Sequence, residues 1–142
     1  MAADLDRAIR GALRAHRVDV VFLAGYLKKL GPKTLAAFNN RILNTHPSLL
    51  PKYGGQGMYG DRVYEAVLAN RAQTTGLTIH LVDAEYDTGP VVSQYEIPVE
   101  PGDTMETLAA RSVARERAFV VETLLRIASG DLQLPALGGV TA

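Results

Sequence analysis

Three polar side chains stand out in the sequence for the chemistry that they could do together. Asn44 and His46 belong to the segment Asn44-Thr45-His46-Pro47, and Asp87 lies in the turn Tyr86-Asp87-Thr88-Gly89-Pro90. An amide can donate to a developing oxyanion, an imidazole can carry a proton near neutral pH, and a carboxylate beside an imidazole raises its basicity and orients it. If the fold brings the three together, they could assist a reaction at a carbonyl carbon.

The spacing of Asn44 and His46 places them on one face of a predicted strand, residues 41–45, because strand side chains alternate with a period of two. The strand ends at this point, and ligands of parallel α/β sheets bind at the carboxyl edge. Two structural alternatives stay open at this level. The Asn–His pair could simply cap a turn, and Asp87 suits an Asx-type turn before Thr-Gly-Pro.

The other two histidines and a lysine pair are weaker candidates. His80 falls inside the predicted strand 77–82, where we expect a hydrogen-bonded sheet histidine rather than a catalytic one. His16 belongs to the last turn of the first predicted helix, which favours a surface position. Lys28 and Lys29 follow the first predicted strand and could meet an anionic group, or could be an ordinary solvated pair.

The segment 55–60 matches the pattern G-x-G-x-x-G, but its context argues against a dinucleotide site. In the true fingerprint the glycines leave a strand directly, whereas here Pro47 and Pro51 stand between the strand and the glycines. A glycine-rich turn before a helix is the better interpretation. No spacing of histidines or carboxylates predicts a metal site.

The elements that must position these groups follow from periodicity and from Gly and Pro punctuation. We expect helices over residues 4–17, 33–38, 61–69 and 103–129, and strands over residues 18–24, 41–45, 77–82 and 91–99. This order predicts an α/β sheet, with a parallel crossover between the first two strands. Residues 133–142 are expected to form a loose tail.

Composition narrows the class of protein. A chain of 142 residues has room for one domain. The absence of cysteine excludes a disulfide scaffold, a thiolate zinc site and a cysteine nucleophile. Fifteen acidic and fifteen basic side chains leave no net field to attract nucleic acid or anionic lipid. The N-terminal segment contains aspartates where a signal peptide needs basic residues. No apolar run is long enough to form a membrane-spanning helix. We therefore expect a cytoplasmic protein that binds neither membranes nor nucleic acid.

The motifs together resemble those of the folate-dependent formyltransferase family, which uses 10-formyltetrahydrofolate. The resemblance covers about residues 5–130 and is closest to the members that formylate glycinamide ribonucleotide in purine biosynthesis. It implies an α/β fold with a mostly parallel, Rossmann-like sheet flanked by helices. The segments that carry it are 23–30, 44–53, 78–83, 86–90 and 109–117.

The resemblance also implies roles for individual residues. Asn44 would donate to the oxyanion, His46 would act as acid and proton carrier, and Asp87 would orient His46 and stabilise its charge. The resemblance implies 10-formyltetrahydrofolate as the cosubstrate, and it implies no metal. Matching positions of the pterin-binding wall are Leu27, Lys28, Leu30, Ala84, Glu85 and Asp87. Matching positions near glycinamide ribonucleotide are Gly25, Asn44 and Glu116, the last at the ribose hydroxyls.

The chain also departs from the family pattern. Family members begin with a strand and a Gly/Ser/Asn loop that binds the ribonucleotide phosphate, and this half has no counterpart here. We therefore expect a catalytic domain over residues 1–130 that lacks the N-terminal strands, followed by a tail over residues 131–142. The alternative functions are a folate-binding module without activity and a formyltetrahydrofolate hydrolase. A homodimer could cover the exposed sheet edge.

Overall fold

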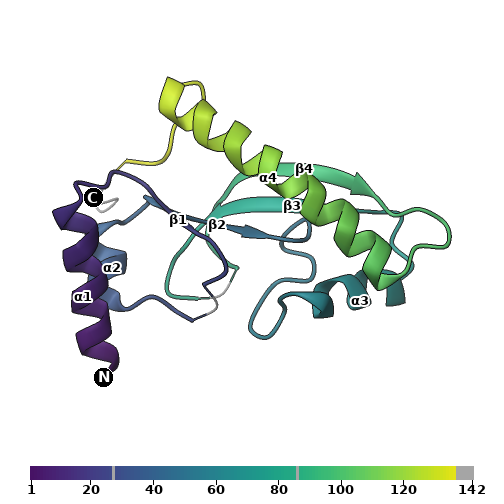
Figure 1. Cartoon of the computed structure of the whole chain (residues 1–142), viewed down its shortest axis with the longest axis horizontal. Helices are drawn as coiled ribbons and strands as arrows, with labels where there is room; N and C mark the ends of the chain where they lie inside the picture. The colour runs from purple at the N-terminus through teal and green to yellow at the C-terminus, as the bar shows by residue number, and fades with distance from the viewer. Residues whose placement is uncertain (27, 86, 137–142) are drawn as a thin grey trace.

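The computed structural model describes residues 1–26, 28–85 and 87–136, which form a four-stranded sheet flanked by helices (Figure 1). Most of the elements lie close to the positions predicted from the sequence. Their order along the chain is α1 (Ala2–Ala15), β1 (Val21–Leu23), α2 (Pro32–Ala37), β2 (Ile42–His46), α3 (Asp61–Ala69), β3 (Thr74–Leu81), β4 (Val91–Pro98) and α4 (Met105–Ser129).

The strands lie in the order β1-β2-β3-β4, and only the first pair is parallel within the described residues. The predicted α/β class with flanking helices is confirmed, but the expectation of a mostly parallel sheet is wrong, because β3 pairs antiparallel with both neighbours. The segment 82–90 joins β3 to β4 directly, and a parallel pair would need a longer crossover. β3 is buried along seven of its eight residues. Burial on both faces is also typical of parallel strands, so the sequence of β3 does not reveal its direction.

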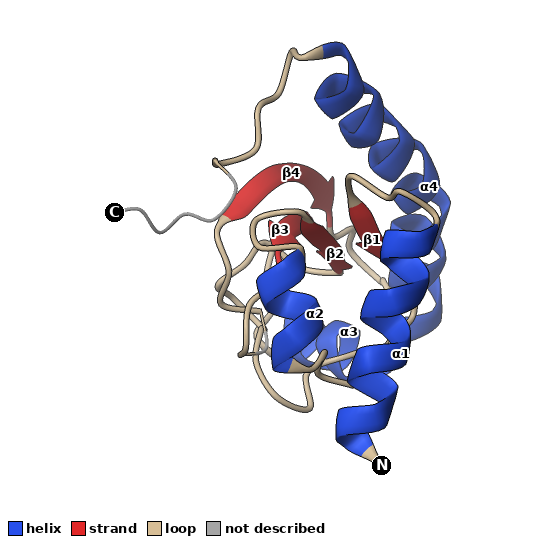
Figure 2. Ribbon diagram, turned by 90° about the vertical axis from the view of Figure 1, so that its left-hand side faces the viewer, coloured by secondary structure: helices blue, strands red, loops and turns tan. Residues whose placement is uncertain are grey.

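Helices cover the two faces of the sheet (Figure 2). On one face, α4 packs Phe119 and its neighbours over the central strands, with Leu43 and Ile79 fully buried beneath. On the other face, α1 and α2 lie side by side and cover Ile42 of β2. α3 packs against the beginning of α4 through Val63 and Leu108. The carboxyl ends of β1 and β2 therefore open between these helices.

A buried carboxylate of α1 holds the start of α2. Asp6 accepts hydrogen bonds from the backbone amides of Lys33 and Thr34, at 2.8 and 2.9 Å, and from the Thr34 hydroxyl at 2.6 Å. The hydrogen bond from Thr34 is the main cause that lowers the pKa of Asp6. At Gly31 a Cβ atom would lie 2.2 Å from Cγ of Asp6, so this position accepts only glycine. The connection from β1 to α2 is thereby fixed to α1.

The end of the described chain returns to the sheet. Leu134 packs against the central core, and Arg41 and Asn40 donate to the carbonyls of Pro135 and Ala136 at 2.7 and 2.9 Å. The remainder of the predicted loose tail, residues 137–142, lies outside the described residues. A division between domain and tail at residue 130 stays a prediction.

Candidate active site

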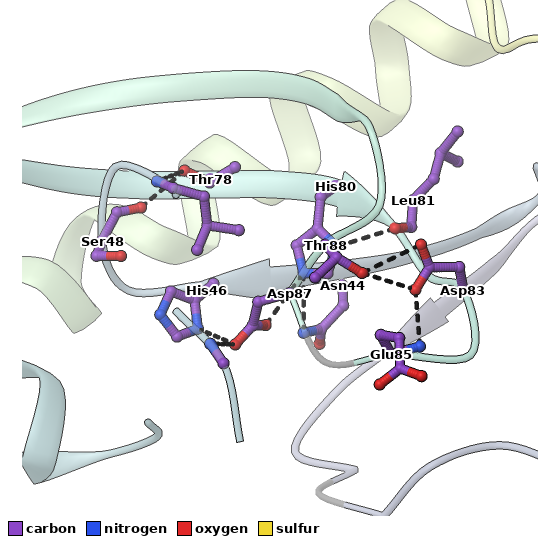
Figure 3. Close-up of polar contacts among 12 residues, drawn as sticks. Asn44, His46, Ser48, Thr78, His80, Leu81, Asp83, Glu85, Asp87 and Thr88 are labelled. Carbon is purple, nitrogen blue, oxygen red and sulfur yellow. Dashed lines mark hydrogen bonds and ion pairs between the residues drawn. The ribbon is translucent and has the colours of Figure 1, made fainter. Parts of the chain in front are cut away.

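Strand pairing places the predicted site residues at one edge of the sheet. In the antiparallel register of β2 and β3, Asn44 lies directly opposite His80. The Asn44 Nδ2 atom is 3.5 Å from His80 Nε2. His46 follows on the same face of β2, at its last residue. Figure 3 shows these side chains converging with Asp87, which comes from the loop after β3.

The loop after β2 is tied to β3 by a buried hydroxyl. The Thr78 Oγ1 atom donates to the carbonyl of Ser48 at 2.7 Å and accepts from the amide of Leu50 at 3.0 Å. Gln94 of β4 donates to the same hydroxyl at 3.0 Å and to the Leu50 carbonyl at 3.1 Å. The loop therefore leaves β2 along a defined path, and this path brings the backbone of residues 53–55 against the site.

His46 has a polar neighbour at each ring nitrogen. Its side chain is only 4% exposed, and Nε2 lies 2.7 Å from the carbonyl of Tyr53. A nitrogen that faces a carbonyl must carry a proton, so the neutral ring has its free lone pair on Nδ1. Nδ1 lies 3.5 Å from Asp87 Oδ2. Burial lowers the pKa of His46, against the opposing charge of Asp87 and the contact with Tyr53.

The Asp87 carboxylate lies between two histidines (Figure 3). Oδ2 faces His46 and accepts a hydrogen bond from the Gly55 amide at 2.9 Å, while Oδ1 lies 3.5 Å from His80 Nε2. Burial by itself would raise the pKa of Asp87. The neighbouring histidines and the hydrogen bond from the Gly55 amide outweigh this effect and lower the pKa. Asp87 is therefore an ionised carboxylate next to a neutral His46 at neutral pH.

These groups line a cavity of about 580 Å³ at the carboxyl edge of β1 and β2. The predicted residues Gly25, Asn44, His46, Asp87 and Glu116 all contribute to its wall. The glycine-rich segment 55–60 forms another side, which assigns a place in the site to the G-x-G-x-x-G match. The volume is within the range of small-molecule sites.

A smaller hollow of about 50 Å³ adjoins this cavity, because Asn44 and Asp87 line both. Its walls include four predicted pterin-wall residues, Lys28, Leu30, Glu85 and Asp87. The Lys29 ammonium lies 3.4 Å from a carboxylate oxygen of Glu85, joining the two sides of the hollow. Of the other predicted wall residues, Ala84 is exposed and lines neither cavity, and Leu27 lies outside the described residues.

Glu116 lies on α4 and lines the main cavity. α4 and α2 cover opposite faces of the sheet. Its carboxylate is half-buried, and burial raises its pKa. It has no hydrogen bond or ion pair within the described part of the chain. An unpartnered carboxylate at a cavity wall is a suitable acceptor for ligand hydroxyl groups.

Sequence reasoning missed two parts of the site. His80 is the hydrogen-bonded sheet histidine that was expected, but its contacts with Asn44 and Asp87 were not foreseen. The two-residue period of β3 and an antiparallel register with β2 would have been needed to find it. The contacts of Tyr53 and Gly55 are made by a backbone carbonyl and amide, which leave no signature in side-chain type.

Among residues 1–26, 28–85 and 87–136, no group of three or more histidine, aspartate or glutamate side chains is arranged to hold a metal ion. No helix in the same residues has both the length and the apolar character to cross a lipid bilayer.

Comparison with known proteins relates the chain to formyl transferases. The family model described as formyl transferase matches residues 2–124. The chain is 48% identical over 112 residues to the chloroplastic phosphoribosylglycinamide formyltransferase of Vigna unguiculata, covering 79% of this chain and 36% of that protein. It is 43% identical over 124 residues to the phosphoribosylglycinamide formyltransferase of Mycobacterium tuberculosis strain H37Rv, covering 87% and 55%.

A solved structure shows the same fold. The glycinamide ribonucleotide transformylase 1 of Symbiobacterium toebii superposes with a TM-score of 0.80 at 38% identity, covering 93% of this chain and 60% of that one. The chain spans 36% of the length of the Vigna unguiculata protein and 55% of the length of the Mycobacterium tuberculosis protein. With most of its residues matched by the family model, the chain belongs to the formyl transferase family.

Proposed function

We propose that the chain carries the site that transfers a formyl group from 10-formyltetrahydrofolate to the amine of glycinamide ribonucleotide. The observation that carries the proposal is the meeting of Asn44, His46 and Asp87 at one cavity. The names of the relatives support the acceptor, since both are phosphoribosylglycinamide formyltransferases. Their meeting supports the residue roles that the sequence resemblance implies.

The two adjoining cavities suit two ligands that must meet. The smaller hollow offers the apolar side chain of Leu30 and polar groups at Lys28 and Glu85, to which a pterin ring could bind. The main cavity offers Glu116 for ribose hydroxyls and Gly25 as a position without a side chain. Asn44 and Asp87 stand where the two cavities join, so the reacting groups would meet beside them.

The cosubstrate supplies a formyl carbon bound to nitrogen, and the substrate amine forms a new bond to that carbon while the old carbon–nitrogen bond breaks. Asn44 donates from its amide nitrogen to the formyl oxygen, where negative charge develops. His46 receives the amine proton at Nδ1 and returns it to the departing nitrogen. Asp87 stabilises the imidazolium while His46 holds the proton. No covalent bond to the protein is required.

The tautomer of His46 supports this assignment. Because the Tyr53 carbonyl binds Nε2–H, the nitrogen that can accept a proton is the one turned toward Asp87. The lowered pKa of His46 keeps this nitrogen unprotonated at neutral pH, as a general base requires. A location in the cytoplasm and assembly as a homodimer stay predictions from the sequence.

The test separates transfer from its alternatives. The purified chain is supplied with 10-formyltetrahydrofolate and glycinamide ribonucleotide, and formylated amine and free formate are measured separately. The proposal predicts formylated amine that depends on Asn44, so that Asn44→Ala lowers kcat by about 10²-fold or more. Formate as the only product would replace the proposal with hydrolysis. Folate binding without either product would leave a binding module and overturn the proposal.

A further inference from the structure

His80 makes three contacts that the proposed reaction does not use. Its ring is 3% exposed and lies at the point where β3 faces β2. Nδ1 is 3.0 Å from the carbonyl of Leu81, Nε2 is 3.5 Å from Asn44 Nδ2, and Nε2 is also 3.5 Å from Asp87 Oδ1. The ring therefore touches two of the three residues to which the reaction is assigned.

The contact with Leu81 decides the tautomer of the ring. A carbonyl oxygen only accepts, so the nitrogen that faces it, Nδ1, carries the proton. In the neutral ring Nε2 is then a hydrogen-bond acceptor. The neighbour that can donate to it is the amino group of Asn44. One side of the Asn44 amide is thereby bound within the protein.

This bond matters because an amide group can turn by half a rotation about its last bond at little cost. Such a rotation exchanges a donor for an acceptor at nearly the same place. An oxyanion requires the donor, and an amide oxygen aimed at it would repel it. A fixed acceptor on one side of the Asn44 amide removes this ambiguity.

We propose that His80 is a positioning residue, whose neutral ring accepts a hydrogen bond from the Asn44 amide and so fixes the orientation of that amide at the site. The proposal rests on the proposed function for its kinetic consequence only. A proton on Nε2 would instead point at Asp87 Oδ1 and oppose the Asn44 amino group. Whether His80 Nε2 carries a proton therefore distinguishes a hydrogen bond from Asn44 from a hydrogen bond to Asp87.

The direct test is nuclear magnetic resonance of the ¹⁵N-labelled full chain at pH 8, where histidine rings are neutral. The His80 resonances are assigned by their loss in His80→Gln. We expect the Nε2 resonance in the range of an unprotonated ring nitrogen and the Nδ1 resonance in the protonated range. We also expect slower exchange of an Asn44 side-chain amide proton than in His80→Leu. A protonated Nε2 overturns the proposal.

The kinetic test compares replacements that keep or remove the acceptor. The amide oxygen of His80→Gln can occupy the position of Nε2, whereas His80→Leu offers no acceptor. We expect His80→Leu to lower kcat by about 10- to 100-fold with little change in KM, and His80→Gln to recover most of the loss. His16→Leu is the matched control, because His16 Nδ1 also contacts a backbone carbonyl, at 2.8 Å from Ala12, but on the surface.

A double-mutant cycle shows through which residue His80 acts. In an Asn44→Ala background, the additional substitution His80→Leu should lower kcat by less than about threefold, because the group that His80 positions is absent. Equal losses in both backgrounds would assign His80 to the general stability of the sheet and overturn the proposal, as would His80→Leu with an unchanged kcat. If the wild-type chain produces no formylated amine, the proposed function fails, and the resonances of Nε2 and Nδ1 still decide this inference.

Discussion

His46 Nδ1 lies 3.5 Å from Asp87 Oδ2, and one short turn of the chain holds both residues. The carbonyl of Tyr53 binds the opposite nitrogen of His46, and the amide of Gly55 donates to the same Asp87 oxygen. The backbone of residues 53–55 therefore contacts both the imidazole of His46 and the carboxylate of Asp87. Small changes in this turn should alter catalysis more than they alter folding.

Gly54 offers a test of this turn. A Cβ atom at residue 54 would lie 2.6 Å from Leu50 Cδ2 and 3.2 Å from Asp87 Cβ. Leu50 can yield at the end of its side chain, but Asp87 has to shift by a few tenths of an ångström. We expect Gly54→Ala to lower kcat by about tenfold, because misplacement of catalytic groups is costly. Steady-state kinetics and a thermal unfolding curve would check it.

Gly11→Ala is the matched control for that substitution. Gly11 is exposed within α1, and an added Cβ would meet no atom within 4 Å beyond the adjoining residues and backbone of its own helix. Alanine is favoured over glycine in a helix interior by roughly 0.5–1 kcal/mol. Gly11→Ala should therefore stabilise the fold and leave kcat unchanged. If Gly54→Ala retains full activity, the 53–55 turn does not set the position of Asp87.

The pKa of His46 predicts how stability depends on pH. Burial lowers this pKa in the folded chain, so near pH 6 the unfolded chain binds more protons than the folded one. Acid therefore favours unfolding, and the contribution of His46 is complete above about pH 7 and decreases as the pH falls through its folded value. The limiting slope for one proton is about 1.4 kcal/mol per pH unit.

His46→Gln removes this titration while retaining a donor toward Tyr53. Its free energy of unfolding, measured with urea between pH 8 and pH 5, should depend less steeply on pH than that of the wild-type chain. His16→Gln serves as the control for loss of an exposed histidine. Parallel pH dependences for wild type and His46→Gln would show that His46 takes up its proton equally in the folded and unfolded chains.

Asp6 is predicted to support the folate side of the site from a distance. Its carboxylate caps α2 through Lys33 and Thr34 and packs against Gly31, next to the segment that contains Lys28 and Leu30. Asp6→Ala should lower the melting temperature and weaken the binding of a folate analogue. Calorimetry and thermal unfolding measure the two effects.

Acid should abolish the difference in stability between Asp6→Ala and the wild-type chain. The pKa of Asp6 is lowered by folding, so its contribution is present above the ordinary range of a carboxyl group and is lost as the pH falls through the folded value. Asp4→Ala, on the exposed first turn of α1, is the control. Equal effects of the two alanine variants would contradict the role of Asp6.

Asp87→Asn tests the carboxylate with the least change in shape. Asp87 has a φ of 56°, a left-handed conformation that asparagine also adopts readily. The fold and the hydrogen bond from Gly55 should persist, while the charge that stabilises a protonated His46 is lost. We expect kcat to fall by roughly 10²- to 10⁴-fold.

Asp131→Asn replaces a surface carboxylate beside Arg126 and should leave the rate unchanged. A substantially active Asp87→Asn enzyme would mean that His46 works without a charged partner. Thermal unfolding of both variants would establish that any loss of rate is not a loss of fold.

The elements with clear local signals were predicted well. α3 spans Asp61–Ala69 as expected, and α4 ends before Gly130, whose φ of 84° requires a left-handed residue. β1 is shorter than predicted, because within the described residues it lies at the edge of the sheet and pairs with β2 alone. The start of α4 also differs, since Thr104 caps the helix while Asp103 binds Arg111 at 2.8 and 2.9 Å.

Relations between strands were beyond the sequence. Apolar β-branched residues favour a buried strand without indicating its direction, so the antiparallel pairing of β3 was not foreseen. That pairing is what places His80 opposite Asn44. Asn44 and His46 could be recognised because they share a strand and a family motif. Their meeting with Asp87 depends on the loop after β3, whose path only the structure reveals.

The most direct test of the account is the rate at which the chain forms formylated glycinamide ribonucleotide, compared for wild type, His46→Ala and His16→Ala. If His46 moves the proton between the two nitrogens, kcat should fall by about 10²-fold or more in His46→Ala. His16→Ala, which removes an exposed histidine, should match the wild type. An unchanged rate for His46→Ala would contradict the assignment of the Asn44, His46 and Asp87 site to formyl transfer.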